Sequence, residues 1–98
     1  MNNQNLGVIN IIRIKQFFGV AISFNIVIDN FPMGSISSNK SLSFTVPYGH
    51  HTVILKKVDN SVPIEIDLNE NQKCVDIVCK AGMGALVARP KLVSVNYR

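Results

Sequence analysis

The segment VAISFNIVID, residues 20–29, places apolar side chains at its even positions and mostly small or polar ones at its odd positions. Successive side chains of a β-strand point to opposite faces of a sheet, so a period of two is typical of a strand with one buried face. A helix would instead repeat its apolar positions every three or four residues. This segment therefore predicts a strand whose inner face carries Val20, Ile22, Phe24, Ile26 and Ile28.

The same period returns in residues 42–46, 62–68 and 75–79, and less cleanly in residues 52–56. Pro63 cannot donate a hydrogen bond to a neighbouring strand, which places its strand at a sheet edge. The inner positions expected in these strands are Leu42, Phe44, Val46, Val53, Leu55, Val62, Ile64, Ile66, Leu68, Val75, Ile77 and Cys79.

The first strand is expected from Gly7 to Phe17 and has a different pattern. Residues 8–12 are apolar at most positions of both parities, which is typical of a strand covered on both faces or interrupted by a bulge. Beyond them Ile12 and Ile14 alternate with Arg13 and Lys15, so Arg13 is assigned to the polar face.

Turn-forming Asn, Asp, Gly and Pro separate these strands, and we find no helical stripe. Strands recurring at this spacing favour a sandwich or a barrel. We therefore predict one all-β domain over residues 1–98, a small antiparallel β-sandwich of about seven to eight strands, immunoglobulin-like or transthyretin-like. Residues 1–6 are expected to be disordered. The alternative is a small β-barrel of OB type.

Composition limits the class of protein. Of the 98 residues 47% are hydrophobic and 16% are charged, the opposite of a disordered chain, and the formal net charge is +4. The basic residues are scattered, so the charge identifies neither nucleic acid nor membrane as a partner. The sequence lacks the pattern of a secretory signal and an apolar run long enough to span a membrane. A cytoplasmic location is expected, or an envelope-associated one if the chain belongs to a longer parent.

The two cysteines are expected to be reduced. Cys74 and Cys79 lie five residues apart. On one extended strand that separation is about 16 Å, well beyond the limit of about 7 Å between the Cα atoms of a disulfide.

From Val27 to Lys57 the order of features resembles the PEGA-type domains, small bacterial β-sandwiches. The matching residues are Val27-Ile28-Asp29-Asn30, Gly34, the strand with Leu42, Phe44 and Val46, and Gly49-His50-His51 followed by Val53 and Leu55. The Pro-Glu-Gly-Ala motif is absent, and Asn30 stands where Gly is usual. The resemblance implies a non-catalytic module that binds carbohydrate or protein.

The sequence shows no spacing of residues that is typical of a catalytic or metal-binding site. The adjacent His50 and His51 would face opposite sides of a strand, so we predict neither a shared metal site nor a catalytic role for them. We expect His51 at the inner rim with its ring bonded to a turn, His50 in solvent, and Asp29 capping its own hairpin. Gly49 is expected to shape the same turn as His51. We predict no enzyme activity and no cofactor.

The favoured hypothesis is a binding or adapter module that contacts protein or carbohydrate through loop tips or a sheet edge. The expected contact residues are Phe31 and Met33 at one hairpin tip and Tyr48 and His50 at a turn. Self-association is expected at the edge that carries Pro63, Glu65 and Asp67. The alternative is a basic β-barrel that binds single-stranded nucleic acid, which the absence of an arginine cluster makes the weaker hypothesis.

Overall fold

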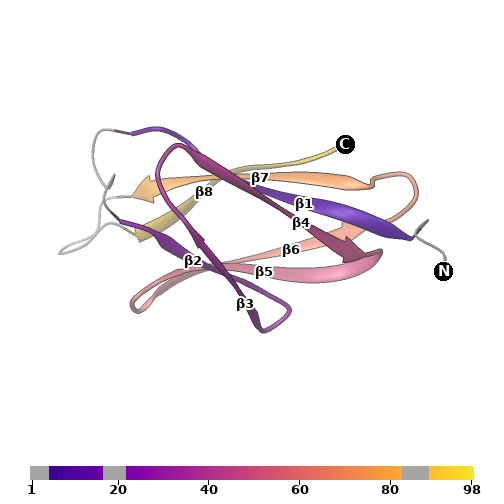
Figure 1. Ribbon diagram of the computed structural model, residues 1–98, viewed down its shortest axis with the longest axis horizontal. Helices are drawn as coiled ribbons and strands as arrows, with labels where there is room; N and C mark the ends of the chain where they lie inside the picture. Colours follow the sequence, from indigo (N-terminus) through magenta and orange to yellow (C-terminus); the bar gives the residue numbers. More distant parts are fainter. Residues whose placement is uncertain (1–4, 17–21, 83–88) are drawn as a thin grey trace.

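The computed structural model describes residues 5–16, 22–82 and 89–98, and these residues form strands and turns without a helix. Figure 1 shows the strands arranged in two layers. The eight strands of the described residues are β1 (Leu6–Arg13), β2 (Phe24–Ile28), β3 (Phe31–Ile36), β4 (Lys40–Pro47), β5 (Gly49–Lys57), β6 (Asn60–Leu68), β7 (Cys74–Gly82) and β8 (Arg89–Tyr97). The expected all-β class is confirmed.

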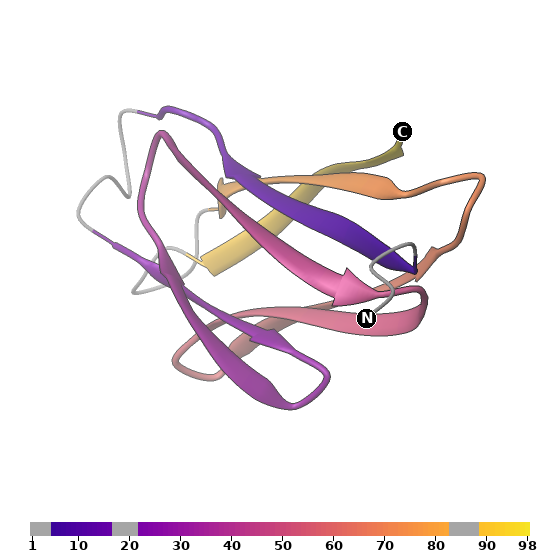
Figure 2. The ribbon, with the colours of Figure 1, turned by 45° about the vertical axis from the view of Figure 1, so that its right-hand side comes forward.

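Each layer is a four-stranded sheet. Sheet 1 has the order β4-β1-β7-β8, and sheet 2 has the order β3-β2-β5-β6. The chain passes from one sheet to the other after β1, β3, β4 and β6, and the two sheets stack face to face (Figures 1 and 2). Each sheet ends in two edge strands, as in a sandwich and unlike the closed barrel that was the alternative.

One pair of neighbours departs from the expected antiparallel arrangement. Strands β1 and β7 run parallel, with Val8 opposite Cys74 and Ile11 opposite Ile77, whereas the other described pairs are antiparallel. Parallel neighbours need a long crossover connection, and here that connection contains the four strands of sheet 2 and the edge strand β4 of sheet 1. The sandwich is therefore mixed.

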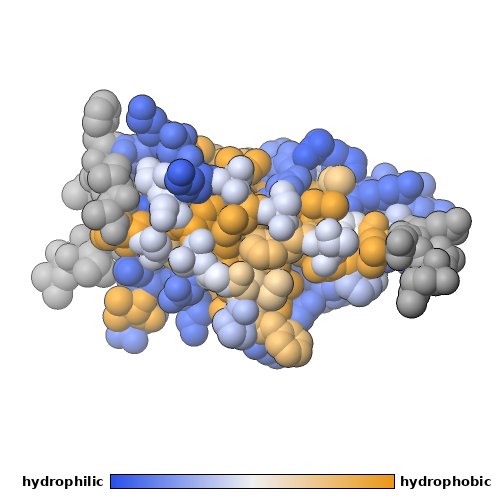
Figure 3. All heavy atoms as spheres, viewed as in Figure 1, coloured by the Kyte–Doolittle hydropathy of each residue, from blue (hydrophilic) through white to orange (hydrophobic). Residues whose placement is uncertain are grey.

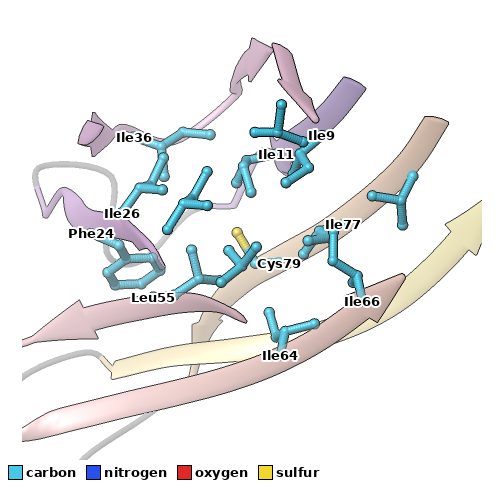
Figure 4. Close-up of a cluster of buried hydrophobic side chains, with 14 of the residues drawn as sticks. Ile9, Ile11, Phe24, Ile26, Ile36, Leu55, Ile64, Ile66, Ile77 and Cys79 are labelled. Carbon is cyan, nitrogen blue, oxygen red and sulfur yellow. The ribbon is translucent and has the colours of Figure 1, made fainter. Parts of the chain in front are cut away.

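The core lies between the sheets and consists mostly of the alternating residues that the sequence indicated. Figure 4 shows side chains of β1 and β7 meeting those of β2, β5 and β6. Phe24, Ile64 and Ile66 are at most 5% exposed, whereas Phe44, on edge strand β4, is only partly buried. The buried hydrophobic residues are Ile9, Ile11, Phe24, Ile26, Ile28, Ile36, Val46, Val53, Leu55, Ile64, Ile66, Leu68, Val75, Ile77, Cys79 and Ala81.

Strand β1 corrects the prediction for the first strand. It ends at Arg13, and its odd positions face the core, so that Arg13 is 1% exposed. The guanidinium lies 4.1 Å from the centre of the Phe24 ring and donates to the carbonyl oxygens of Ile22 and Ile36. Parallel pairing with β7 aligns these odd positions with the buried residues of that strand, which overrides the local alternation. Residues 17–21, which include Phe17 and the start of the expected second strand, lie outside the described residues.

The structure describes only residues 5 and 6 of the N-terminal segment that the sequence predicted to be disordered. Strand β1 already begins at Leu6, and the carbonyl of Asn5 accepts a 2.9 Å hydrogen bond from the Tyr48 amide. Residues 5 and 6 are therefore ordered by pairing with the end of β4, contrary to expectation. Residues 1–4 lie outside the described part of the chain.

The turn between β2 and β3 has the form that its residues favour. Asp29 and Asn30 have φ angles of 52° and 70°, as a two-residue turn of type I′ requires. The turn between β5 and β6 is less favourable, because Val58 takes a φ of 54°. A β-branched residue rarely adopts that left-handed conformation.

Within the described ranges there is no helix long and apolar enough to cross a membrane.

Candidate functional site

His51 joins three elements at the end of sheet 2. Its Nδ1 lies 2.5 Å from Oδ2 of Asp29, and its Nε2 lies 2.6 Å from the carbonyl oxygen of Pro47. A carbonyl and a carboxylate can only accept, so both ring nitrogens donate and the ring is the imidazolium. The residue is 7% exposed, as expected for a histidine bonded to a turn at the inner rim.

The pKa values of this pair shift in opposite directions. Burial lowers the pKa of His51, but the hydrogen bonds to Asp29 and Pro47 outweigh it and leave the pKa raised above 6.5. Burial likewise raises the pKa of Asp29, but its bonds to His51 and to the Thr52 amide leave it below 3.8. Both groups are therefore charged at pH values between the lowered pKa of Asp29 and the raised pKa of His51.

The sequence predicted that Asp29 would cap its own hairpin, but its carboxylate bonds to β5 instead. Its Oδ1 accepts from the amide of Thr52 at 2.9 Å, and its own amide donates to the Thr52 carbonyl at 2.9 Å. Because Ile28 pairs with Val53, Asp29 at the start of the type I′ turn lies beside Thr52, and its carboxylate reaches the neighbouring strand β5 instead. Asp29 thus ties the β2–β3 hairpin to β5.

His50 lies on the opposite face of β5 and is held by two carboxylates. Its Nδ1 is 3.0 Å from Asp67 Oδ1, and its Nε2 is 2.6 Å from Glu65 Oε1. These bonds raise its pKa, and bonds from Thr52 and His50 lower the pKa of Glu65. His50 is exposed, but it is an imidazolium in a carboxylate clamp and not merely solvated.

This arrangement leaves no ring nitrogen available for a metal, because each nitrogen of His50 and His51 already donates to an oxygen. Among the described residues no group of three His, Cys, Asp or Glu side chains could hold a metal ion. Cys79 is buried, and burial raises the pKa of its thiol to about 11, so it is a poor nucleophile at neutral pH. Cys74 and Cys79 are free thiols.

The four expected contact residues do not form one site. Phe31 and Met33 are 68% and 39% exposed on the edge strand β3, which β2 separates from β5. Tyr48 packs against the core, and His50 lies in its clamp. Gly49 has a φ of 130°, a conformation that favours glycine, where the chain turns from β4 into β5.

Two shallow hollows lie on the surface of the described residues. One lies between β6 and β8, beside Arg89 and Lys91, and the other lies on the outer face of sheet 2, beside Lys56. Neither is lined by an aromatic side chain. Single-stranded nucleic acid is held by aromatic stacking beside basic groups, so the hollows do not favour the nucleic-acid alternative.

Three of the four edge strands carry features that oppose pairing with another strand. Strand β3 has Pro32 and a bulge beside it, and β8 has Pro90 between Arg89 and Lys91. Strand β6 lies at an edge, as Pro63 predicted. Proline, charge and bulges are the usual means by which natural sheets prevent edge-to-edge association.

Strand β6 is further occupied near its end. The amide of Asp67 donates to the hydroxyl of Tyr97 at 3.1 Å, and its carbonyl accepts from the side chain of Gln72 at 2.7 Å. The two-residue turn makes Lys57 and Asn60 a hydrogen-bonded pair, and such pairs alternate along an antiparallel ladder. The main-chain groups of Pro63 and Asp67 therefore face away from β5. The edge expected to mediate self-association is thus largely closed.

Strand β4 lacks these features. It runs from Lys40 to Pro47 without an internal proline or bulge, and Lys40 is its one charged residue. Figure 1 shows it crossing the front of the molecule, where Figure 3 shows mostly pale and orange residues. Every residue from position 40 to position 45 is exposed except the partly buried Phe44.

The direction of the main-chain groups of β4 follows from two hydrogen bonds. The Tyr48 amide donates to Asn5, which makes Asn5 and Tyr48 a hydrogen-bonded pair, and the Val8 amide donates to Lys73 and so points away from β4. Because such pairs alternate along an antiparallel ladder, the even residues of β4 bond to β1. The amides and carbonyls that face outward are therefore those of Ser41, Ser43 and Thr45, and they have no main-chain partner in the described part of the chain.

Comparison with known proteins adds nothing to this geometry. No family model, curated protein or solved structure matched the chain. The two features of the described surface that bear on function are therefore the exposed edge of β4 and the polar network around β5.

Proposed function

We propose that the protein is a non-catalytic binding module that recruits an extended protein segment as an additional strand beside β4. The observation that carries this proposal is the row of outward amides and carbonyls at Ser41, Ser43 and Thr45. An extended peptide satisfies such groups by continuing the ladder of sheet 1. A carbohydrate cannot continue that ladder, so a protein partner is favoured.

The side chains of β4 support the same proposal. Leu42 and Phe44 pair with Ile11 and Ile9 and therefore lie on the inner face, but Leu42 remains 36% exposed because β4 is an edge strand of the described sheet. Strand β3, the edge strand of sheet 2 that carries the 68% exposed Phe31, lies on the same side of the sandwich (Figure 1). An added strand would cover part of this apolar seam while its main chain bonds to β4.

The test uses a displayed library of random peptides selected on the immobilised protein. Ser43→Pro removes an outward N–H without removing a bond to β1, whereas Ser61→Pro makes the matched change on the edge strand β6. We expect selected peptides to alternate apolar residues, to bind the wild type and Ser61→Pro equally, and to lose binding to Ser43→Pro. Peptides that bind all three proteins equally, or a selection that yields no binder, would contradict the proposal.

A further inference from the structure

We infer that the strand added beside β4 is β4 of a second copy of this chain, giving a symmetric dimer with one continuous sheet. The inference rests on the proposed function, because it names the partner of the same edge. It differs from the self-association expected from the sequence, which was placed on β6. That strand is closed by Pro63, Tyr97 and Gln72.

The main-chain groups of β4 are self-complementary. Ser41, Ser43 and Thr45 are spaced evenly around Ser43, so an antiparallel pair centred there sets Ser43 opposite Ser43 of the second copy and Ser41 opposite its Thr45. This register matches all three outward residues and gives about six main-chain hydrogen bonds. Moving the centre to Phe44 would bring Pro47, which has no N–H, opposite Ser41.

The side chains fit this register on both faces. On the inner face Leu42 stands opposite Phe44 of the second copy, in a pair without main-chain bonds, where side chains approach most closely. On the outer face the opposed residues are small hydroxyl side chains, since Ser43 meets Ser43 and Ser41 meets Thr45. The Ser43 hydroxyl donates to Oδ1 of Asn10 at 2.5 Å within its own chain, so it does not block the approach.

Charge also permits a second copy at this edge. The one charged residue of β4, Lys40, stands opposite Val46 in this register, so the pairing sets no two like charges together. The net charge of +4 on each copy opposes association only at long range, and salt should therefore strengthen the dimer. An interface of one strand pair is small, which predicts a weak dimer with a dissociation constant in the micromolar range.

The first experiment is sedimentation equilibrium of the full chain over a wide concentration range, with Ser43→Lys and Ser43→Glu as variants. We expect the wild type to form a dimer. In that dimer the two copies of Ser43 lie opposite each other at the two-fold axis. Each variant alone places like charges opposite each other and should weaken the dimer at least roughly tenfold. An equimolar mixture of the two variants should restore a mixed dimer.

Controls separate this effect from loss of folding. Ser61→Lys and Ser61→Glu make the same changes on β6 and should leave the dimer unchanged. A Ser43→Cys variant in a Cys74→Ser background should form an intermolecular disulfide under mild oxidation, because residues directly opposite lie within disulfide range. The buried Cys79 should stay reduced. Crosslinking of Ser61→Cys instead of Ser43→Cys would overturn the inference.

The inference and the proposed function fail in different ways. A wild-type monomer at every concentration, or a dimer that neither Ser43 variant weakens, overturns the second copy as partner. The peptide selection then still decides the proposed function, because peptides that require the Ser43 amide would show that β4 accepts a strand from another protein. A dimer weakened by both variants and restored by their mixture supports the inference.

Discussion

His51 donates to Asp29 across 2.5 Å and so ties the start of β5 to the tip of the β2–β3 hairpin. The opposite side of the same ring donates to the carbonyl of Pro47, at the end of β4. Sheet 1 and sheet 2 are therefore joined through one protonated histidine. Because β4 carries the proposed binding edge, this ring lies at one end of that edge.

The charge of His51 makes part of the stability dependent on pH. Its pKa is raised in the folded state, so its contribution is complete below 6.5 and is lost as pH rises through the raised value. The pKa of Asp29 is lowered, so its contribution is complete above 3.8 and is lost as pH falls through the lowered value. We expect the pair to stabilise the fold most between these two pH values.

The measurement is an NMR titration of the two histidines, combined with urea unfolding at several pH values. Asp29→Asn should lower the pKa of His51 toward its ordinary value while that of His50 stays raised. The free energy of unfolding of the wild type should fall as pH rises from 6.5 through the raised pKa of His51, and this slope should shrink in Asp29→Asn. An unchanged His51 pKa in Asp29→Asn would show that the bond does not hold the proton.

Removal of the buried guanidinium should destabilise the protein. Arg13→Met keeps the length of the side chain but leaves the carbonyls of Ile22 and Ile36 without this donor and removes the contact with Phe24. We expect a loss of about 2–4 kcal/mol in the free energy of unfolding, measured in urea.

Lys15→Met is the matched control, because Lys15 is exposed two residues further along. It should change the free energy of unfolding by less than about 0.5 kcal/mol. Equal effects of the two substitutions would contradict the buried position of Arg13.

Gly7 lies where no side chain fits. A Cβ at this position would stand 2.7 Å from the carbonyl oxygen of Lys73 and 2.9 Å from a methyl carbon of Leu68. That carbonyl already accepts from Val8, so it cannot move without loss of a β1–β7 hydrogen bond. Gly7→Ala should lower the free energy of unfolding by about 1–3 kcal/mol.

Gly82→Ala serves as the control for Gly7→Ala. Its Cβ would meet the nearest atom, in the Lys91 side chain, at 3.5 Å, an ordinary contact. Thermal unfolding of both variants should show a lower midpoint for Gly7→Ala alone.

Val58 offers a substitution that should stabilise the fold. It takes a φ of 54° and is 71% exposed, so the strain of a β-branched residue is offset by little packing. Val58→Gly removes that strain and should raise the free energy of unfolding by up to about 1 kcal/mol. Val93→Gly, in β8, should lower it, because glycine weakens a strand interior. A lower thermal midpoint for Val58→Gly would contradict the strain.

The alternation of the sequence predicted the strands and most of the core, because burial between two sheets imposes a period of two on residues such as Phe24, Ile26 and Ile64. It failed at Arg13, where both parities of β1 are apolar and the register with β7 decides which face is buried. That register joins residues far apart in the chain, and no local pattern encodes it.

The candidate site was predictable only in pieces. The sequence placed His51 at the inner rim, but its bond to Asp29 spans 22 residues and depends on which strand lies beside β2. The proposed binding edge was missed because exposure of the main-chain groups of Ser41, Ser43 and Thr45 follows from the order of strands in sheet 1. The absence of an internal proline, a bulge and a second charge in residues 40–47 was the signal that could have indicated it.

Amide hydrogen exchange along β4 distinguishes the main-chain groups that bond to β1 from those that are open to a partner strand. In dilute solution we expect slow exchange at Leu42, Phe44 and Val46, which bond to β1, and fast exchange at Ser41, Ser43 and Thr45. As the protein concentration rises, or a selected peptide is added, the second set should become protected while the first set is unchanged. Protection of Ser41, Ser43 and Thr45 at every concentration, without a partner, would show that the edge of β4 is already closed and would contradict the account.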